Sequence, residues 1–456
     1  MNASALALRR STVNRLLVGM LVLLACFGQP NAVYLVVPFF YPLLATYFLL
    51  LLMYLLVSND FHVGDYVARM GIGIPLAAFF LLASASILYA RVPAFAVTLL
   101  LSAALKVMMF YMLLIAARRT HMNNIVARTI VAAAVFFSVT GIALFLGIVL
   151  FDLAPIREFG SMDIGGGLDY EQQLRFYGLG FVRSETSLLA MVFPRLQSFF
   201  AEPGYFAFFL ELSLFATLYC KYLDIRSPRQ TRRMNQAAAL QLVALMLSLS
   251  LGAVVAIAGG MLVYFLASRT LRLTATSVLK AGAMLAVVGV LWLIWEVAEE
   301  PLSLIYKILV AERFETEYGS NSADTRREVF QLGLNLVGER PLIGWGFGQV
   351  RIVLEGLGVN NSFLTVVAEL GLLGLLAYLG ILLSVVLTIR NSVALSQSLG
   401  QSEVRATAAI AGMFAATTLH SLLIDTSWSF IYWLAISLVF LHYLYLRSVV
   451  REFRQP

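Results

Sequence analysis

The chain has 456 residues, of which 61% are hydrophobic and 12% charged, and its mean hydropathy is +0.87. This composition excludes an ordinary soluble globular protein, and repeated long apolar runs indicate a polytopic α-helical membrane protein. The net charge is +7, and the basic residues are scattered between those runs. This distribution argues against nucleic acid as a partner and for anionic membrane lipid. Cys26 and Cys220 both fall in apolar runs, so no disulfide framework is expected.

The apolar runs predict an all-α membrane fold with about twelve spans. With both termini in the cytoplasm, twenty of the 32 Lys and Arg fall in cytoplasmic segments, as the positive-inside rule expects. Residues 236–267 fit either one long tilted helix or two short ones broken near Gly252, and basic residues on both flanks favour two. At about 15 residues each, these would leave a thinned region facing the exterior. The expected spans are 13–28, 33–57, 71–90, 93–116, 128–151, 203–222, 237–250, 252–267, 280–298, 361–389, 406–424 and 428–446.

Two long exterior loops are expected to divide the chain. The second loop is basic although it lies outside the cytoplasm, where positive charge is less favoured, and handling an anionic substrate at the outer membrane face would explain it. Its six Lys and Arg, in residues 299–359, are Lys307, Arg313, Arg326, Arg327, Arg340 and Arg351. The five expected parts are helices in 1–151, a loop in 152–202, helices in 203–298, a loop in 299–360, and helices with a cytoplasmic tail in 361–456.

The end of the first loop carries a charged pair before an apolar run. Pro203 suits the first turn of a helix, so Glu202 would sit near the positive end of the helix dipole. Glu202 is then either a charged helix start or a partner of Arg195 at a surface that faces substrate.

In the second loop, Thr325-x-x-Glu328 matches a capping box and predicts a helix over 325–337. Arg326 and Arg327 would then lie in its first turn, where a cation opposes the helix dipole by about 0.3–1 kcal/mol. A bound anion would turn that cost into a gain. The alternative is salt bridging of these arginines to Glu328 or Glu315.

Two further features follow along the chain. Residues 344–348 read Gly-Trp-Gly-Phe-Gly, which lacks the βαβ context of a dinucleotide loop and predicts a tight turn with Trp345 as an interface aromatic. Four ionisable residues fall inside apolar runs, where they are functional candidates by default or pair with one another, for example Lys106 with Glu211 or Glu369. The four are Lys106, Glu211, Glu369 and His420.

Four ordered motifs lie between residues 190 and 385. They are Arg195 with Glu202-Pro203; Asp324-Thr325-Arg326-Arg327; Glu339-Arg340-Pro341-Leu342-Ile343-Gly344-Trp345-Gly346; and Asn360-Asn361-Ser362-Phe363-Leu364 leading to Glu369-Leu370-Gly371-Leu372-Leu373-Gly374. This order resembles the bacterial O-antigen polymerase and O-antigen ligase superfamily. The ligases carry His-Asn where this chain has Asn360-Asn361, and asparagine cannot act as a titrating base. The departure favours polymerase over ligase.

The resemblance implies metal-independent glycosyl transfer at the periplasmic face of the bacterial inner membrane, without a cofactor. The donor would be a glycan on a polyprenyl diphosphate such as undecaprenyl diphosphate, and the acceptor another lipid-linked repeat unit of an O-antigen or exopolysaccharide. A chain-length regulator protein is a possible partner, and the expected fold is that of the type C glycosyltransferases. Arg326 and Arg327 would support the leaving diphosphate, with Glu202 as base. The expected substrate-binding residues are Arg195, Trp345, Asn360, Asn361 and Glu369.

Two alternatives stay open. A ligase would move the same glycan onto lipid A-core or a protein. A lipid-linked glycan flippase would predict paired halves and short loops, and the sequence has neither.

Overall fold

The structure is a computed structural model. It describes residues 3–27, 49, 71–117, 122–151, strands between 157 and 198, 200, 203–223, 227–248, 250–268, 317–354, 358–426 and 428–454.

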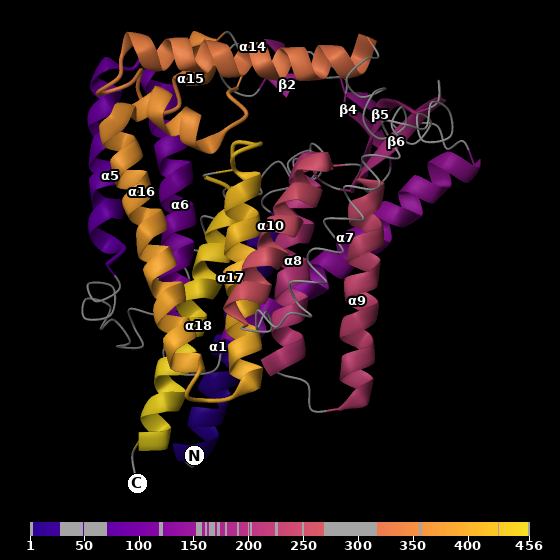
Figure 1. The fold of residues 1–456 in the computed structure, drawn as a ribbon, viewed down its shortest axis with the longest axis vertical. Coiled ribbons are helices and arrows are strands. Elements are labelled where there is room, and N and C mark those ends of the chain that lie inside the picture. Colours follow the sequence, from indigo (N-terminus) through magenta and orange to yellow (C-terminus); the bar gives the residue numbers. More distant parts are fainter. Residues whose placement is uncertain are drawn as a thin grey trace, which may run out of the picture.

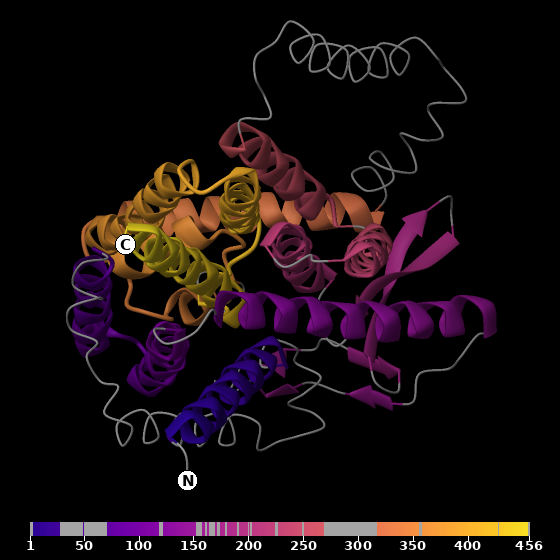
Figure 2. The same cartoon turned by 90° about the horizontal axis from the view of Figure 1, so that it is seen from below.

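Most of the described helices stand side by side along the long axis, while α7 runs obliquely across the others (Figures 1 and 2). Five of them, α6, α7, α8, α16 and α18, are long and apolar enough to cross a membrane. The helices of this bundle are α1 (Ala3–Phe27), α5 (Gly73–Ser86), η1 (Ile87–Tyr89), α6 (Pro93–Ala117), α7 (Met122–Phe151), α8 (Pro203–Leu223), α9 (Pro228–Leu247), α10 (Leu251–Ala267), α16 (Ser362–Ser396), α17 (Gln401–His420) and α18 (Phe430–Arg454).

The centre of the bundle is packed by large aromatic side chains and by close helix contacts. Trp433, Tyr432 and Tyr219 are almost fully buried there. Gly260 in α10 and Gly412 in α17 allow two backbones to touch, because a Cβ atom at Gly260 would lie 2.6 Å from the Gly412 carbonyl oxygen. Small residues at helix contacts are the usual means of close packing in membranes, where apolar burial gives little drive between helices.

The described helices fall on ten of the twelve predicted spans, and of the other two, 33–57 and 280–298, only Leu49 is described. The predicted break within 236–267 is confirmed, since α9 ends at Leu247 and α10 begins at Leu251. The predicted start of the first helix at 237 is wrong. Ser227 caps α9 by accepting from the Gln230 N–H at 3.4 Å, and Pro228 follows at the first helical position.

The first long loop contains strands, which the all-α prediction missed. The strands are β1 (Arg157–Phe159), β2 (Met162–Asp163), β3 (Asp169–Tyr170), β4 (Leu174–Tyr177), β5 (Gly180–Leu188) and β6 (Met191–Ser198). Four of them form an antiparallel sheet in the order β1-β4-β5-β6, and β2 pairs with β3. Aromatic, β-branched and polar residues mix in this loop, and this composition is typical of strands. The prediction rested on apolar spans and did not use it.

Helix α14 (Glu317–Glu339) lies across one end of the bundle, opposite the end where the N and C labels lie (Figure 1). The short helix α15 (Val350–Val353) follows it. Val329 and Leu336 of α14 are buried in a small apolar cluster with residues of α16. Gly333 permits the close approach, because a Cβ atom there would lie 2.9 Å from the Leu364 side chain. The second loop is thus packed onto the bundle at this end.

Candidate functional site

The start of α16 is fixed by Asn361, one of the predicted binding residues. Its Oδ1 accepts from the backbone N–H groups of Phe363 and Leu364, both at 2.9 Å. Its Nδ2 donates to the Leu422 carbonyl at 3.0 Å. Both ends of the Asn361 amide therefore hold structure, as expected of an N-cap residue. The neighbouring Asn360 is exposed and is the residue of this pair that can meet a ligand.

Helix α16 is broken at Gly371, which has φ 66° and ψ −167°. This backbone region is essentially restricted to glycine. A Cβ atom at Gly371 would overlap the Leu342 carbonyl group. Directly after the break, the Leu372 N–H donates to the Pro341 carbonyl of the second loop at 2.8 Å. The loop thus inserts its backbone where the helix opens.

The predicted glycine turn is confirmed and makes the remaining contacts with the break. Gly344, Gly346 and Gly348 have φ values of 68°, 104° and 74°. The Gly346 N–H donates to the Glu369 carbonyl at 2.8 Å, and the neighbouring N–H of Trp345 donates to α16 one residue earlier, at Ala368, at 2.9 Å. The turn and the broken helix form one rigid unit.

The Glu369 side chain lies beneath this turn and is only 8% exposed. The backbone amides of Gly348 and Val350 hydrogen-bond its carboxylate. The charged groups that act on it are Arg351 and Asp425. A carboxylate buried at the end of a membrane helix and held by amide donors is a functional candidate by default.

Three chain segments meet beside Glu369. Ser362, the first residue of α16, donates through Oγ to Asp425 Oδ1 at 3.2 Å. Tyr205, at the start of α8, donates through its hydroxyl to the Asp425 backbone carbonyl at 3.3 Å. Gly204 packs against Ile424, and a Cβ atom at Gly204 would lie 2.6 Å from the Ile424 side chain. The starts of α8 and α16 and the α17–α18 turn therefore converge at this end of the bundle.

Of the two site residues predicted around the end of the first loop, Arg195 is described and Glu202 is not. Glu202 lies outside the described residues, although α8 begins at Pro203 as predicted, beside Asp425. Arg195 lies in β6, where the backbone register sets it opposite Arg183 of β5. Two basic positions thus face each other across the strand pair.

The predicted start of the loop helix at Thr325 is wrong, because α14 begins at Glu317. Arg326 and Arg327 lie in the middle of α14, so the argument from the helix dipole does not apply to them. A Thr-x-x-Glu pair is also compatible with a helix interior, so this motif alone did not locate the start of α14. Arg327 is exposed, so its guanidinium can reach an anion as a surface side chain.

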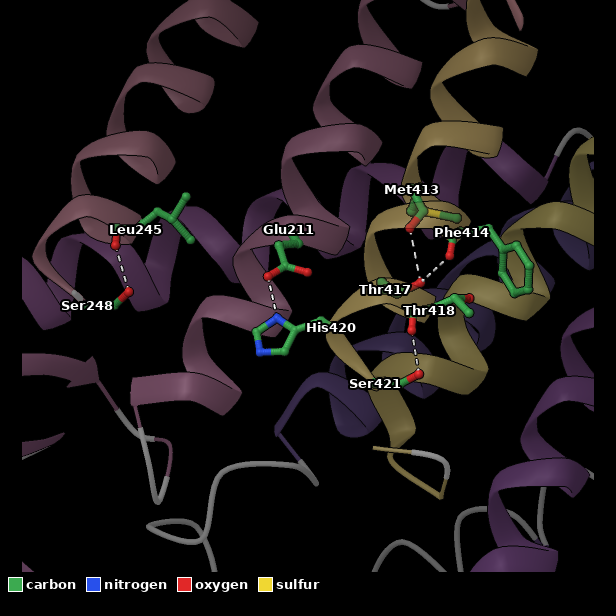
Figure 3. A network of polar contacts seen from close by, with 9 residues as sticks. All are labelled: Glu211, Leu245, Ser248, Met413, Phe414, Thr417, Thr418, His420 and Ser421. Atoms are coloured by element: carbon green, nitrogen blue, oxygen red, sulfur yellow. Dashed lines mark hydrogen bonds and ion pairs between the residues drawn. The ribbon is translucent and has the colours of Figure 1, made fainter. Parts of the chain in front are cut away.

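The proposed pairing of Lys106 with Glu211 or Glu369 is also wrong. Glu211 of α8 instead meets His420 of α17, with 2.5 Å between Oε1 and Nδ1 (Figure 3). Both are buried, and Glu211 Oε2 has no hydrogen-bond partner among the described residues. Lys106 donates to Ser102 in its own helix at 2.6 Å and lies over the Phe430 ring.

Sequence reasoning did not include Ser362 or Arg351 among the predicted site residues. Asp425, a lone acid in the short link between two apolar runs, is the next candidate for the base together with Glu369 if Glu202 is not the base. The described residues hold no group of three His, Cys, Asp or Glu side chains that could bind a metal.

These features define a multi-pass helical membrane protein with a polar site at one end of its bundle, where a long loop docks on a broken helix. Residues 236–379 match a family model described as O-antigen ligase. The match runs from α9 through the second loop and past the break in α16, which confirms the resemblance carried by the motifs. A comparison with curated proteins gives no match.

Proposed function

We propose that this protein is a polysaccharide polymerase that joins repeat units linked to polyprenyl diphosphate at the periplasmic face of the bacterial inner membrane. The observation that carries the proposal is the docking of the Pro341–Gly346 turn on the broken helix, which buries Glu369 within the segment that matches the O-antigen ligase family. Glycosyl transfer from a lipid-linked donor needs a polar site at one face of the membrane, and this end of the bundle offers one.

In the proposed reaction, the bond between the donor sugar's anomeric carbon and the diphosphate oxygen breaks. A bond from that carbon to an acceptor hydroxyl oxygen forms, and the hydroxyl proton passes to a base. The diphosphate leaves with the added negative charge, so cationic donors aid its departure more than an acid would. No metal or cofactor is required by this scheme.

The roles are proposed from the chemistry of the residues and from the motifs that carry them. Arg326 and Arg327 on α14, with Arg195 from β6, are the proposed partners of the diphosphate, because guanidinium groups form paired hydrogen bonds with phosphate oxygens. Glu202 is the proposed base, next to the α8 start that touches Asp425. Asn360, Asn361 and Glu369 are the proposed substrate-binding residues. The ring of Trp345, expected with them, is engaged by Arg91 and Arg340 instead. Asn361 also has a structural role, because its side chain caps α16 and donates to the Leu422 carbonyl.

The second candidate function is ligation of the same glycan to lipid A-core or to a protein, and the family match favours it as much as polymerisation. Polymerase is preferred because Asn360 stands at the position where the ligases carry histidine. An exposed asparagine can hydrogen-bond a sugar, but it cannot take its proton.

Acceptor identity is the test. The purified full-length protein in lipid nanodiscs is given a lipid-linked repeat unit alone, or the same donor with lipid A-core. Polymerase activity predicts products of two or more repeats on the polyprenyl carrier in the first mixture. Transfer only to lipid A-core would assign the ligase function instead. In cells, deletion of the gene should collapse the surface glycan ladder to single repeat units.

A further inference from the structure

Trp345 lies within cation–π distance of two arginines that come from different segments. The guanidinium carbon of Arg340 lies 4.1 Å from the indole centroid, and that of Arg91 lies 5.5 Å from it. The indole N–H donates to the Leu336 carbonyl at 3.1 Å, which fixes the ring. The Tyr89 hydroxyl donates to the Ile343 carbonyl at 2.7 Å and ties the α5–α6 turn to the glycine turn. The indole ring and the glycine turn are therefore held in place before any ligand arrives.

The two guanidinium groups are not neutralised within the described part of the chain. Both side chains are exposed, and among the described residues no carboxylate lies within ion-pair distance of either. Stacking on an indole face leaves the N–H edges of a guanidinium free to bind an anion. Two such cations on one ring form a ready position for a phosphate group.

Exposed apolar side chains adjoin the cluster. Leu342 and Ile343, next to Arg340 in the chain, are 62% and 51% exposed, and Leu88 beside the α5–α6 turn is 92% exposed. Helices α5 and α16 stand side by side at one edge of the bundle, with the glycine turn at their upper end (Figure 1). Further exposed leucines continue along these helices: Leu81 on α5, and Leu372, Leu373, Leu376, Leu379 and Leu383 on α16. This edge has the character of a lipid-facing surface.

We propose that Arg91, Trp345 and Arg340 form a binding site for the phosphate of an anionic phospholipid of the surrounding bilayer, with its acyl chains lying along the exposed leucines. The arginines and Trp345 at the end of the helices would meet the phosphate of such a lipid, and the exposed leucines below them would meet its acyl chains. The site uses other side chains than the Glu369–Asp425 region, although the glycine turn that carries Trp345 also contacts Glu369. A lipid bound here would brace the glycine turn from outside.

The test is native mass spectrometry of the full-length protein released from nanodiscs that contain equal amounts of phosphatidylglycerol and phosphatidylcholine. The variants are Arg91→Gln, Arg340→Gln and the double variant. The matched control is Arg390→Gln, an exposed arginine toward the other end of α16. Thermal unfolding and gel filtration in detergent confirm that each variant folds.

Wild-type protein and Arg390→Gln should retain phosphatidylglycerol about tenfold more than phosphatidylcholine, and the folded double variant should lose most of that preference. Equal retention of the two lipids by the wild type would overturn the proposal, as would an unchanged preference in the double variant. A parallel sample with added polyprenyl diphosphate distinguishes the other source of phosphate. Displacement of the phospholipid by equimolar polyprenyl diphosphate would assign the cluster to the glycan carrier and overturn the proposal too.

Discussion

The Gly346 N–H donates to the Glu369 carbonyl across the break in α16, so a loop amide takes the place that a helix amide would fill in an unbroken helix. The position of the Glu369 carboxylate is therefore tied to the geometry of the second long loop. Any change that closes the break or distorts the turn should alter the site without touching its charged groups.

Gly371→Ala tests this link. A Cβ atom there would meet the Leu342 carbonyl, and the backbone conformation itself costs a non-glycine residue about 1–3 kcal/mol. We expect a clearly lower unfolding temperature in detergent and strongly reduced polymer. The stability control is Gly338→Ala, where a Cβ atom would meet nothing within 4 Å. Equal unfolding temperatures for the two variants would show that the break is not a constraint.

The loop arginines should matter through charge and geometry. Arg326→Ala and Arg327→Ala should each reduce surface polymer strongly while protein levels stay near normal, because positions in the middle of α14 tolerate alanine well. Lysine should rescue poorly wherever the arginine makes a two-pronged phosphate contact. The measurement is the glycan ladder together with immunoblotting. Normal ladders from both alanine variants would remove the support for a diphosphate role.

The Glu211–His420 pair should behave as a coupled unit. Removing one partner of a buried hydrogen-bonded pair costs about 1–3 kcal/mol, because the other polar group is left buried and unpaired. Glu211→Leu and His420→Phe should each destabilise, and the double variant should be more stable than the sum of the single effects implies, by about 0.5–3 kcal/mol. Unfolding of the four proteins in detergent measures the coupling. Thr140→Val, at a half-buried helix position where the hydroxyl bonds to carbonyls of its own helix, provides the control. Additive effects would mean that the two side chains are independent.

The sequence predicted those parts of the structure whose signals are local. Pro203 starts α8, Asn361 starts α16, and the glycines at 344, 346 and 348 form a turn, because each depends on the conformational preference of one or two residues. The break at Gly371 was missed because a glycine in an apolar run reads equally well as a helix interior, and only docking of the loop selects the broken form. The expectation that intramembrane ionisable residues pair with one another holds for Glu211, but its partner His420 was not selected, since the register between α8 and α17 is set by packing across the bundle.

The orientation of the bundle gives a direct prediction. A reporter fused after Gly400, between α16 and α17, should read cytoplasmic, and one fused after Ser320, in α14, should read exterior. α14 and the start of α1 lie at opposite ends in Figure 1, as this topology requires if the N-terminus is cytoplasmic. An exterior signal at Gly400 would require one added or lost span and would break the twelve-span count.

The last prediction concerns the proton acceptor. Glu202→Gln keeps the size and hydrogen bonding of the side chain but removes its basicity, so single-turnover polymerisation should fall by about 10²-fold or more, while donor binding persists. Glu369→Gln is the matched comparison, because that carboxylate is buried and held by the amides of Gly348 and Val350. If Glu369 binds substrate, its glutamine variant should weaken donor or acceptor binding more than the chemical step. Purified variants in nanodiscs, with binding and single turnover measured separately, distinguish the two roles. Wild-type turnover in Glu202→Gln, with a lost chemical step in Glu369→Gln, would move the base to Glu369 and leave Glu202 as the charged start of α8.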